Sequence, residues 1–247
     1  MPALDDMAVI VTGASSGIGH AVAVACAREG AHVLASGRNA DALAETALAA
    51  GGDMAVHAAD LTVAGAADDM VADALDRFGR LEGIVHCAGT IRRGEDVRDT
   101  TDEQWQQLLD ENLTASFAVA RAAVRAMTHG GSVVLLGSQL AHIAAPGNAS
   151  YVANKGGIEA LVRALAVDHG PAGIRVNALS PGLVHTHMSY VDRADFASRI
   201  EEFAARHPLR RIGAPEDIAG PAVFLLSPAS AWMTGQSLVV DGGFTIQ

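Results

Sequence analysis

A glycine-rich turn directly after the first strand-like run is the feature that most constrains what this chain can fold into. The β-branched run at residues 8–11 precedes the turn, and an Ala- and Val-rich helical pattern follows it at residues 21–28. Glycines there permit a tight turn, close approach of backbone N–H groups to a phosphate, and close packing of the helix on the strand. The spacing is Gly-xxx-Gly-x-Gly instead of the standard Gly-x-Gly-xx-Gly. The turn predicts a dinucleotide phosphate site formed by Gly13, Ser15, Ser16, Gly17, Ile18 and Gly19.

The same alternation of strand and helix continues to the end of the chain. Further strands are expected at residues 31–36, 54–57, 83–87, 132–136, 174–179 and 237–240. Helices are expected between them, among them residues 64–78, 151–169 and 215–226. This order predicts an α/β fold with a doubly wound parallel sheet, and no linker or repeat divides residues 1–247 into separate domains. The irregular stretch at about 183–208 is long for a connection and is interpreted as a substrate loop.

Composition narrows the class of partner. Half of the 247 residues are hydrophobic, which indicates a globular protein with a substantial core. The net charge is −11 without a dense Lys/Arg block, which argues against nucleic acid or an anionic membrane as principal partner. No apolar run reaches the length of a membrane span, no signal-peptide pattern is present, and Cys26 and Cys87 both lie in apolar stretches. A reduced, cytoplasmic protein is therefore expected.

The end of the second strand bears on the choice of dinucleotide. No Asp or Glu stands there to accept the adenosine ribose hydroxyls, whereas Arg38 could pair with a ribose phosphate through its planar guanidinium. This favours NADP(H); the alternative is that Arg38 is a solvated cation and that NAD(H) is used. Further along, Asp60, beside Leu61, could accept a hydrogen bond from an adenine amino group. The small-residue turn Ala88-Gly89 could pass beneath a flat cofactor.

Tyr151 and Lys155 are the candidate chemical pair. Four residues apart on a helix, they project from one face, and a nearby ammonium favours phenolate over phenol. We therefore expect a lowered pKa for Tyr151, which would make it a usable general acid or base. Ser138 follows the strand at residues 132–136, at the sheet edge where ligands bind, and Asn112 interrupts a helical pattern where an amide is a mediocre helix former.

Taken in order, the glycine turn, Asn112, Ser138, Tyr151-xxx-Lys155 and Pro181-Gly182 closely resemble the classical short-chain dehydrogenases/reductases over essentially the whole chain. The resemblance implies a single Rossmann-type domain with a seven-stranded parallel sheet, usually in a homotetramer whose interfaces include the last helix and strand. It implies that Tyr151 is the general acid/base, that Lys155 lowers its pKa and holds the nicotinamide ribose, and that Ser138 binds the substrate oxygen. It also implies a relay water at Asn112 and cofactor contacts at Tyr151, Lys155, Pro181, Gly182, Val184 and Thr186.

Two segments depart from the family pattern or vary within it. The usual Asn-Asn-Ala-Gly reads His86-Cys87-Ala88-Gly89, which puts the asparagine contacts of the family in doubt. Ile91-Arg92-Arg93, together with residues 220–225, is similar to the sugar-acid members, such as gluconate and deoxy-ketogluconate dehydrogenases. An arginine there could pair with a substrate carboxylate, or could only brace the loop or a subunit contact. The candidate substrate contacts are Arg93, Gln139, His142 and His187.

The histidines at 142, 185 and 187 show no recognisable metal spacing, and no metal is expected. The sequence therefore predicts an NAD(P)(H)-dependent oxidoreductase that interconverts a secondary alcohol and a ketone, with a polar substrate such as a sugar acid. One rival is a β-ketoacyl carrier-protein reductase, which the scarcity of Lys/Arg clusters disfavours. A rival of another class is a catalytically silent dinucleotide-binding sensor or scaffold.

Overall fold

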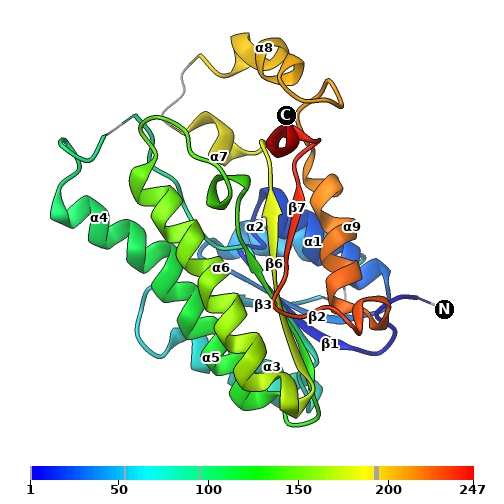
Figure 1. The fold of residues 1–247 in the computed structure, drawn as a ribbon. Helices are drawn as coiled ribbons and strands as arrows, with labels where there is room; N and C mark the ends of the chain where they lie inside the picture. The colour runs from blue at the N-terminus through cyan, green and yellow to red at the C-terminus, as the bar shows by residue number, and fades with distance from the viewer. Residues whose placement is uncertain (1, 53, 95, 192–194) are drawn as a thin grey trace.

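The computed structural model describes residues 2–52, 54–94, 96–191 and 195–247. Within them, seven strands pair in parallel in the order β3-β2-β1-β4-β5-β6-β7 (Figure 1). This confirms the predicted doubly wound sheet. The strands are β1 Ala8–Thr12, β2 His32–Gly37, β3 Ala55–Ala58, β4 Gly83–His86, β5 Gly131–Leu136, β6 Ile174–Pro181 and β7 Ser237–Val240.

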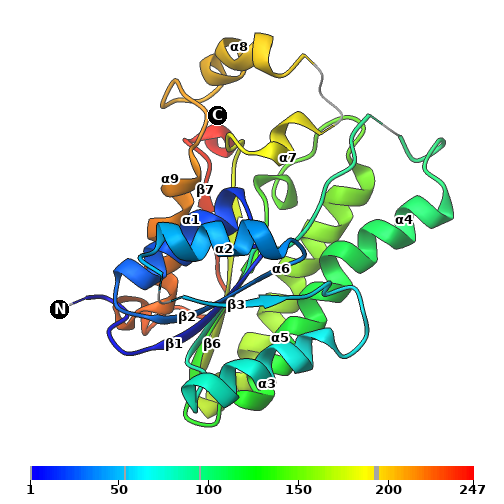
Figure 2. The ribbon, with the colours of Figure 1, turned by 180° about the vertical axis from the view of Figure 1, so that it is seen from behind.

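Helices cover both faces of the sheet (Figures 1 and 2). One face carries α1, α2 and α9, and the other carries α3, α5 and α6. Alternate residues of each strand enter the two cores: on β1, Val9 and Val11 face the first group while Ile10 faces the second. The helices are α1 Gly17–Arg28, α2 Ala40–Ala49, α3 Ala66–Phe78, α4 Asp102–Leu109, α5 Ala115–Ala126, α6 Ala149–His169, α7 His187–Tyr190, α8 Ile200–Ala205 and α9 Pro215–Leu226.

The strand order reverses between β1 and β4, which are hydrogen-bonded neighbours in the sheet. The connections after these two strands leave toward opposite sides, so a crevice opens beyond their carboxyl ends. Both the glycine turn after β1 and Ala88-Gly89 after β4 lie at this point. The topology therefore brings together two segments that are about 70 residues apart in sequence.

Two segments differ from the structure that the sequence predicts. The helical pattern before Met127 is divided by a π-helical turn at Asp110–Thr114, which joins α4 to α5. The stretch expected to be an irregular substrate loop contains α7, α8 and the short 3₁₀ turn Ala197–Arg199; residues 192–194 lie outside the described part. Figure 1 shows α7 and α8 beyond the carboxyl ends of the strands. No helix in the described residues is long and apolar enough to cross a bilayer.

Candidate active site

The glycine turn is packed so closely that side chains cannot be added to it. Gly13 has φ +65°, and a Cβ there would lie 2.7 Å from the backbone N of Ala88. A Cβ on Gly19 would lie 2.2 Å from the carbonyl O of Gly13, because α1 starts directly against the turn. The bare backbone at the start of α1 is the type of surface that binds a pyrophosphate.

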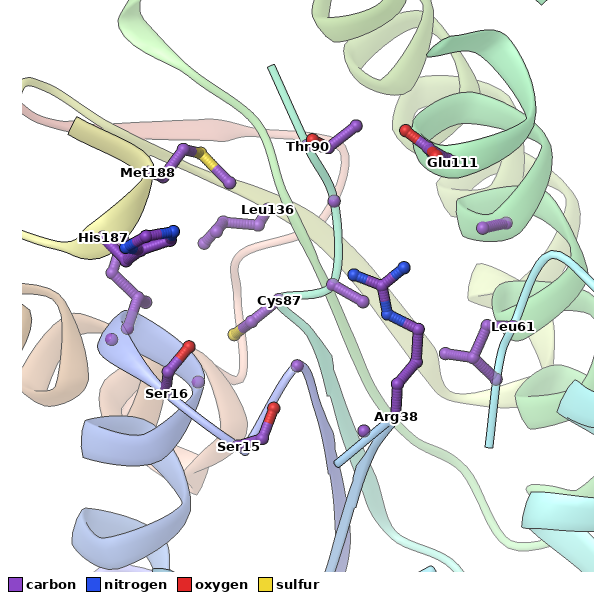
Figure 3. A pocket seen from close by; sticks show the side chains of 18 of the residues that line it. Ser15, Ser16, Arg38, Leu61, Cys87, Thr90, Glu111, Leu136, His187 and Met188 are labelled. Carbon is purple, nitrogen blue, oxygen red and sulfur yellow. The ribbon is translucent and has the colours of Figure 1, made fainter. Parts of the chain in front are cut away.

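A cavity of about 350 Å³ lies over this turn (Figure 3). Its wall includes eleven of the predicted cofactor residues at the turn and at the ends of β2, β3 and β4, and also Thr186. Figure 3 shows Arg38 extending across the cavity, with Leu61 beside it and Ser15 and Ser16 on the turn. The predicted residues that line it are Gly13, Ser15, Ser16, Gly17, Ile18, Gly19, Arg38, Asp60, Leu61, Ala88, Gly89 and Thr186.

The groups at the adenosine end fit a dinucleotide. Arg38 is exposed, and its guanidinium has no hydrogen-bond or ion-pair partner within the described ranges. Asp60 is held by Thr62, whose backbone N and hydroxyl donate to its Oδ1 at 3.0 and 2.7 Å. These hydrogen bonds lower the pKa of Asp60, so the carboxylate stays ionised as an acceptor.

A second cavity of about 280 Å³ adjoins the first, and the two share Ile18, Leu136, Thr186 and Met188 as lining residues. Ser138 and Tyr151 line this second cavity. So do Pro181, Gly182 and Val184, which were predicted as cofactor contacts and do not line the first cavity. The physical reason is that β4 and β5 lie between β1 and β6 in the sheet, so the end of β6 faces the adjoining space.

Tyr151 and Lys155 lie one turn apart on α6, and both are buried. The Lys155 ammonium donates to the Leu136 carbonyl at 2.7 Å and lies 5.6 Å from the centroid of the Tyr151 ring. Lys155 lines neither cavity and is 4% exposed. The Ser138 hydroxyl accepts a hydrogen bond from the Leu140 backbone N at 3.1 Å and thereby begins a 3₁₀ turn.

The expected direction of the Tyr151 pKa shift is wrong, because the structure raises this pKa. Burial raises the pKa of Tyr151, while a hydrogen-bonding contact with Ser138 and the positive charge of Arg93 oppose that rise. Burial also lowers the pKa of Lys155 to about 8. The i,i+4 spacing does place the two groups on one face, but the loss of solvent around the phenol outweighs the nearby charges.

Asn112 connects the π-helical turn to the segment after β4. Its Nδ2 donates to the Leu108 carbonyl at 3.0 Å, and its Oδ1 accepts from the Thr90 backbone N at 3.3 Å. A Cβ on Gly89 would lie only 2.7 Å from this Oδ1. Asn112 is 1% exposed and lines neither cavity, so its direct contacts are with protein groups that shape the cofactor wall.

In the unusual His86-Cys87 pair, His86 has structural contacts, whereas Cys87 lines the cofactor cavity (Figure 3). His86 is buried, and its Nδ1 is 2.8 Å from the Thr12 hydroxyl, which also accepts from the Ala88 N at 3.3 Å. His86 therefore ties β1 to β4. Burial lowers its pKa to about 3, so the ring is neutral, and burial raises the pKa of the Cys87 thiol to about 12, which removes its nucleophilic form at neutral pH.

The four predicted substrate contacts differ in which cavity they line and in what they contact. Gln139 and Arg93 line the second cavity, but Arg93 Nη1 donates to the Met188 and Val191 carbonyls at 3.0 and 2.8 Å. His187 lines the cofactor cavity instead, where Figure 3 shows its ring beside Met188. His142 lines neither cavity, because its Nε2 contacts Glu159 Oε1 at 2.9 Å and the Ser237 hydroxyl at 3.1 Å. His142 does lie in a segment that borders the second cavity, but its side chain points away from the cavity, toward Ser237 on β7.

Sequence reasoning missed several polar residues of the second cavity. Asn148, Arg206 and His207 line it, and no local pattern distinguishes them from ordinary loop residues. The one feature of the sequence that could have indicated them is that they lie in, or next to, segments that were expected to border the substrate. In the part of the chain that the structure describes, no three His, Cys, Asp or Glu side chains are grouped to hold a metal ion.

Known proteins resemble this chain over nearly its whole length. The family model described as Enoyl-(Acyl carrier protein) reductase matches residues 13–245. The L-rhamnose 1-dehydrogenase (NAD(P)(+)) of Azotobacter vinelandii is 36% identical, with 98% of each chain covered. The D-threitol dehydrogenase of Mycolicibacterium smegmatis is 35% identical, with 99% of this chain and 95% of the relative covered.

Solved structures agree with the sequence relatives. A short-chain type dehydrogenase/reductase from Mycobacterium marinum superimposes with a TM-score of 0.91 at 33% identity, covering 99% of this chain and 97% of the other. These matches, together with the glycine turn at the point where the strand order reverses, define an oxidoreductase. It acts on CH–OH or C=O groups with a nicotinamide dinucleotide. The chain belongs to the short-chain dehydrogenase/reductase family.

Proposed function

We propose that the protein oxidises a secondary alcohol of a small polyhydroxylated compound, or reduces the corresponding ketone, with Tyr151 as proton carrier. The observation that carries this proposal is the position of Tyr151 and Ser138 in a cavity that adjoins the cofactor cavity. A bound nicotinamide would supply or accept the hydride. The named relatives for rhamnose and threitol support a polyhydroxylated substrate.

The chain's own residues account for the proton and the oxygen. In the reducing direction the Tyr151 hydroxyl donates its proton to the substrate oxygen, while Ser138 donates a hydrogen bond to the same oxygen. Lys155, held by the Leu136 carbonyl, lies in the second turn of α6, and its proposed role is to orient the ribose. Asn112 fixes the Gly89-Thr90 wall and, through it, the shape of the cofactor cavity. We also propose that Asn112 holds a water molecule that relays the proton.

The charge of the second cavity bears on the substrate class. Its described lining contains Arg93 and Arg206 but no Asp or Glu, so its charge favours neutral or anionic substrates over cationic ones. Arg93 already donates to the backbone of Met188 in α7 and of Val191 directly after it, which supports its alternative role as a brace of that segment. We therefore place neutral sugars and polyols ahead of sugar acids.

A panel of polyols, aldoses, sugar acids and β-ketoacyl thioesters, assayed by nicotinamide absorbance, tests the substrate class. We expect the highest kcat/KM with a neutral polyol or sugar. The 3-oxoacyl-(acyl-carrier-protein) reductase of Chlamydia pneumoniae is 35% identical over 96% of each chain, so a carrier-linked substrate is the second candidate. Preference for the thioester would replace the first proposal by the second. If Arg93→Ala abolishes turnover of sugar acids alone, the result would show that Arg93 pairs with a substrate carboxylate.

The cofactor preference is proposed to be NADP(H), with NAD(H) possible, because Arg38 is exposed without a partner in the described structure and residues 36–39 at the end of β2 include no Asp or Glu that could accept the ribose hydroxyls. Replacing Arg38 with Gln should weaken NADPH binding by about 10- to 100-fold, the range for one charge-assisted hydrogen bond, and leave NADH binding nearly unchanged. Fluorescence titration measures both affinities. Arg28→Gln, at the far end of α1, is the control. Tighter binding of NADH to the wild type would overturn the preference.

The raised pKa of Tyr151 leads to a pH prediction with a definite sign. A raised pKa keeps the phenol protonated to higher pH, and alcohol oxidation needs the phenolate to accept a proton. We therefore expect kcat/KM for oxidation to rise with pH from about pH 7 to about pH 10 without levelling off, and kcat/KM for ketone reduction to stay nearly constant over that range because the phenol remains protonated. Initial rates in both directions measure this. An oxidation rate that is flat with pH would assign the proton transfer to another group.

We also propose that residues 1–247 act as one domain in a cytoplasmic homotetramer. The seven strands within the described ranges belong to one sheet, and both cysteines are free. Trp232 after α9 is fully exposed, Phe224 on α9 is 37% exposed, and Ile246 at the C-terminus is 85% exposed. This apolar surface at the last helix and strand fits a subunit contact. Light scattering gives the molar mass, and a monomer would contradict the assembly.

A further inference from the structure

His207 is a buried imidazole that the proposed proton transfer does not use. It follows α8 and precedes Pro208, in the segment that closes over the carboxyl ends of the strands. Its side chain lines the same cavity as Ser138 and Tyr151, and the residue is only 3% exposed. A buried, titratable side chain at the substrate cavity calls for a partner that the protein alone does not provide.

The orientation of the ring is determined by its contacts. Nδ1 lies 2.8 Å from the Phe203 carbonyl oxygen, and a carbonyl only accepts hydrogen bonds, so Nδ1 carries the proton. One side of the ring packs against Phe244, with the ring centroids 5.1 Å apart. In the neutral imidazole, Nε2 is therefore an acceptor whose direction is fixed.

Nε2 has no hydrogen-bond partner among the described residues, although the atom is buried. The Oε1 atom of Gln139, the residue after Ser138, is likewise buried and without a partner, and Gln139 lines the same cavity. Much of the remaining lining is apolar, including Ile91, Leu140 and Phe203. Such a cavity with a few directed polar atoms is typical of a small-molecule site.

Two buried acceptors require donors. A carboxylate or ketone oxygen can only accept, whereas a hydroxyl group can donate to Nε2. The oxygen that reacts is already assigned to Ser138 and Tyr151, so the hydroxyl at His207 must be another one of the same substrate. We propose that His207, with Gln139 next to Ser138 in the chain, determines specificity by accepting a hydrogen bond from a second, unreacted substrate hydroxyl. This inference rests on the proposed function.

A series of four-carbon alcohols measures this recognition without knowledge of the natural substrate. 2-Butanol, 2,3-butanediol and threitol share one chain length and differ in hydroxyl number. At about pH 8, we expect the wild-type kcat/KM for oxidation to rise along the series. The threitol to 2-butanol ratio of kcat/KM is the readout, because a general loss of folding or of cofactor binding cancels from it.

Two variants separate recognition from folding. His207→Asn keeps a side-chain donor near the position of Nδ1 for the Phe203 carbonyl but removes Nε2, whereas His207→Gln restores an acceptor near the position of Nε2. We expect His207→Asn to lower the threitol to 2-butanol ratio by about tenfold, the effect of one hydrogen bond, and His207→Gln to recover part of it. NADPH titration and thermal unfolding serve as checks that both variants fold.

The outcomes distinguish the two proposals. If the wild type prefers the hydroxylated alcohols and His207→Asn keeps the full preference, the inference about His207 is wrong and the proposed function stands. If the wild type shows no such preference, the polyhydroxylated substrate class is wrong, and the role of His207 fails with it. A lowered ratio in His207→Asn that His207→Gln partly restores supports both.

Discussion

Replacing Tyr151 with Phe is expected to lower kcat/KM by roughly 10²- to 10⁴-fold in both reaction directions, the usual contribution of a general acid or base. The substitution removes only the hydroxyl of a buried ring that lines the second cavity. Because Tyr151 does not line the cofactor cavity, NADPH affinity should stay nearly unchanged. Steady-state rates and a fluorescence titration on the same preparation measure the two quantities.

The chain's other tyrosine provides a matched control. Tyr190 lies at the end of α7, its hydroxyl is 2.7 Å from His185 Nε2, and it lines neither cavity. Tyr190→Phe should therefore keep most of the activity. Full activity in Tyr151→Phe would remove the proton-transfer role from this residue. A wild type that binds the dinucleotide but turns over no alcohol or ketone in the panel would favour the silent sensor or scaffold.

Gly19→Ala is expected to have the second largest effect, on the cofactor site and on stability together. The added Cβ would lie 2.2 Å from the Gly13 carbonyl O and 3.0 Å from the Ala14 N, so α1 must move away from the turn. Overpacking of this kind costs about 1–3 kcal/mol of unfolding free energy. The displaced backbone should also weaken dinucleotide binding by about tenfold or more, since it forms the floor of the cavity.

Gly156→Ala is the control for this substitution. Gly156 lies inside α6, and a Cβ there would meet no heavy atom within 4 Å. Since Ala forms helix better than Gly by about 1 kcal/mol, this variant should be as stable as the wild type or slightly more stable. Urea denaturation and NADPH titration compare the two. Equal behaviour of both variants would mean that the close contact between α1 and the glycine turn does not hold in solution.

Strand ends were the most predictable part of this protein. The glycine turn, Ala88-Gly89 and Ser138 each follow an apolar run, and parallel strands bring their carboxyl ends to one edge of the sheet. Local spacing was equally informative for Tyr151 and Lys155 on α6. The π-helical turn at Asn112 was not predicted, and the sequence showed only that an amide there is a poor helix former. The hydrogen bond that Asn112 accepts from the Thr90 backbone is a long-range contact, which local sequence does not reveal.

Side-chain direction in the loops was not predictable. His142 was expected at the substrate and instead contacts Glu159 and Ser237, while His207 was overlooked and lines the substrate cavity. Both lie in segments whose placement depends on packing against distant elements. The pKa of Tyr151 was misjudged for the same reason, since it depends on how fully the fold removes water around the ring.

The sequence by itself determined the doubly wound sheet, the glycine turn at its switch point, and the helix on which Tyr151 and Lys155 share a face, because these follow from local periodicity and strand order. Only the tertiary structure decided which polar atoms are buried without partners beside Ser138 and Tyr151, and therefore which side chains can select a substrate. Burial and orientation are properties of contacts between residues far apart in the chain, and no short stretch of sequence encodes them.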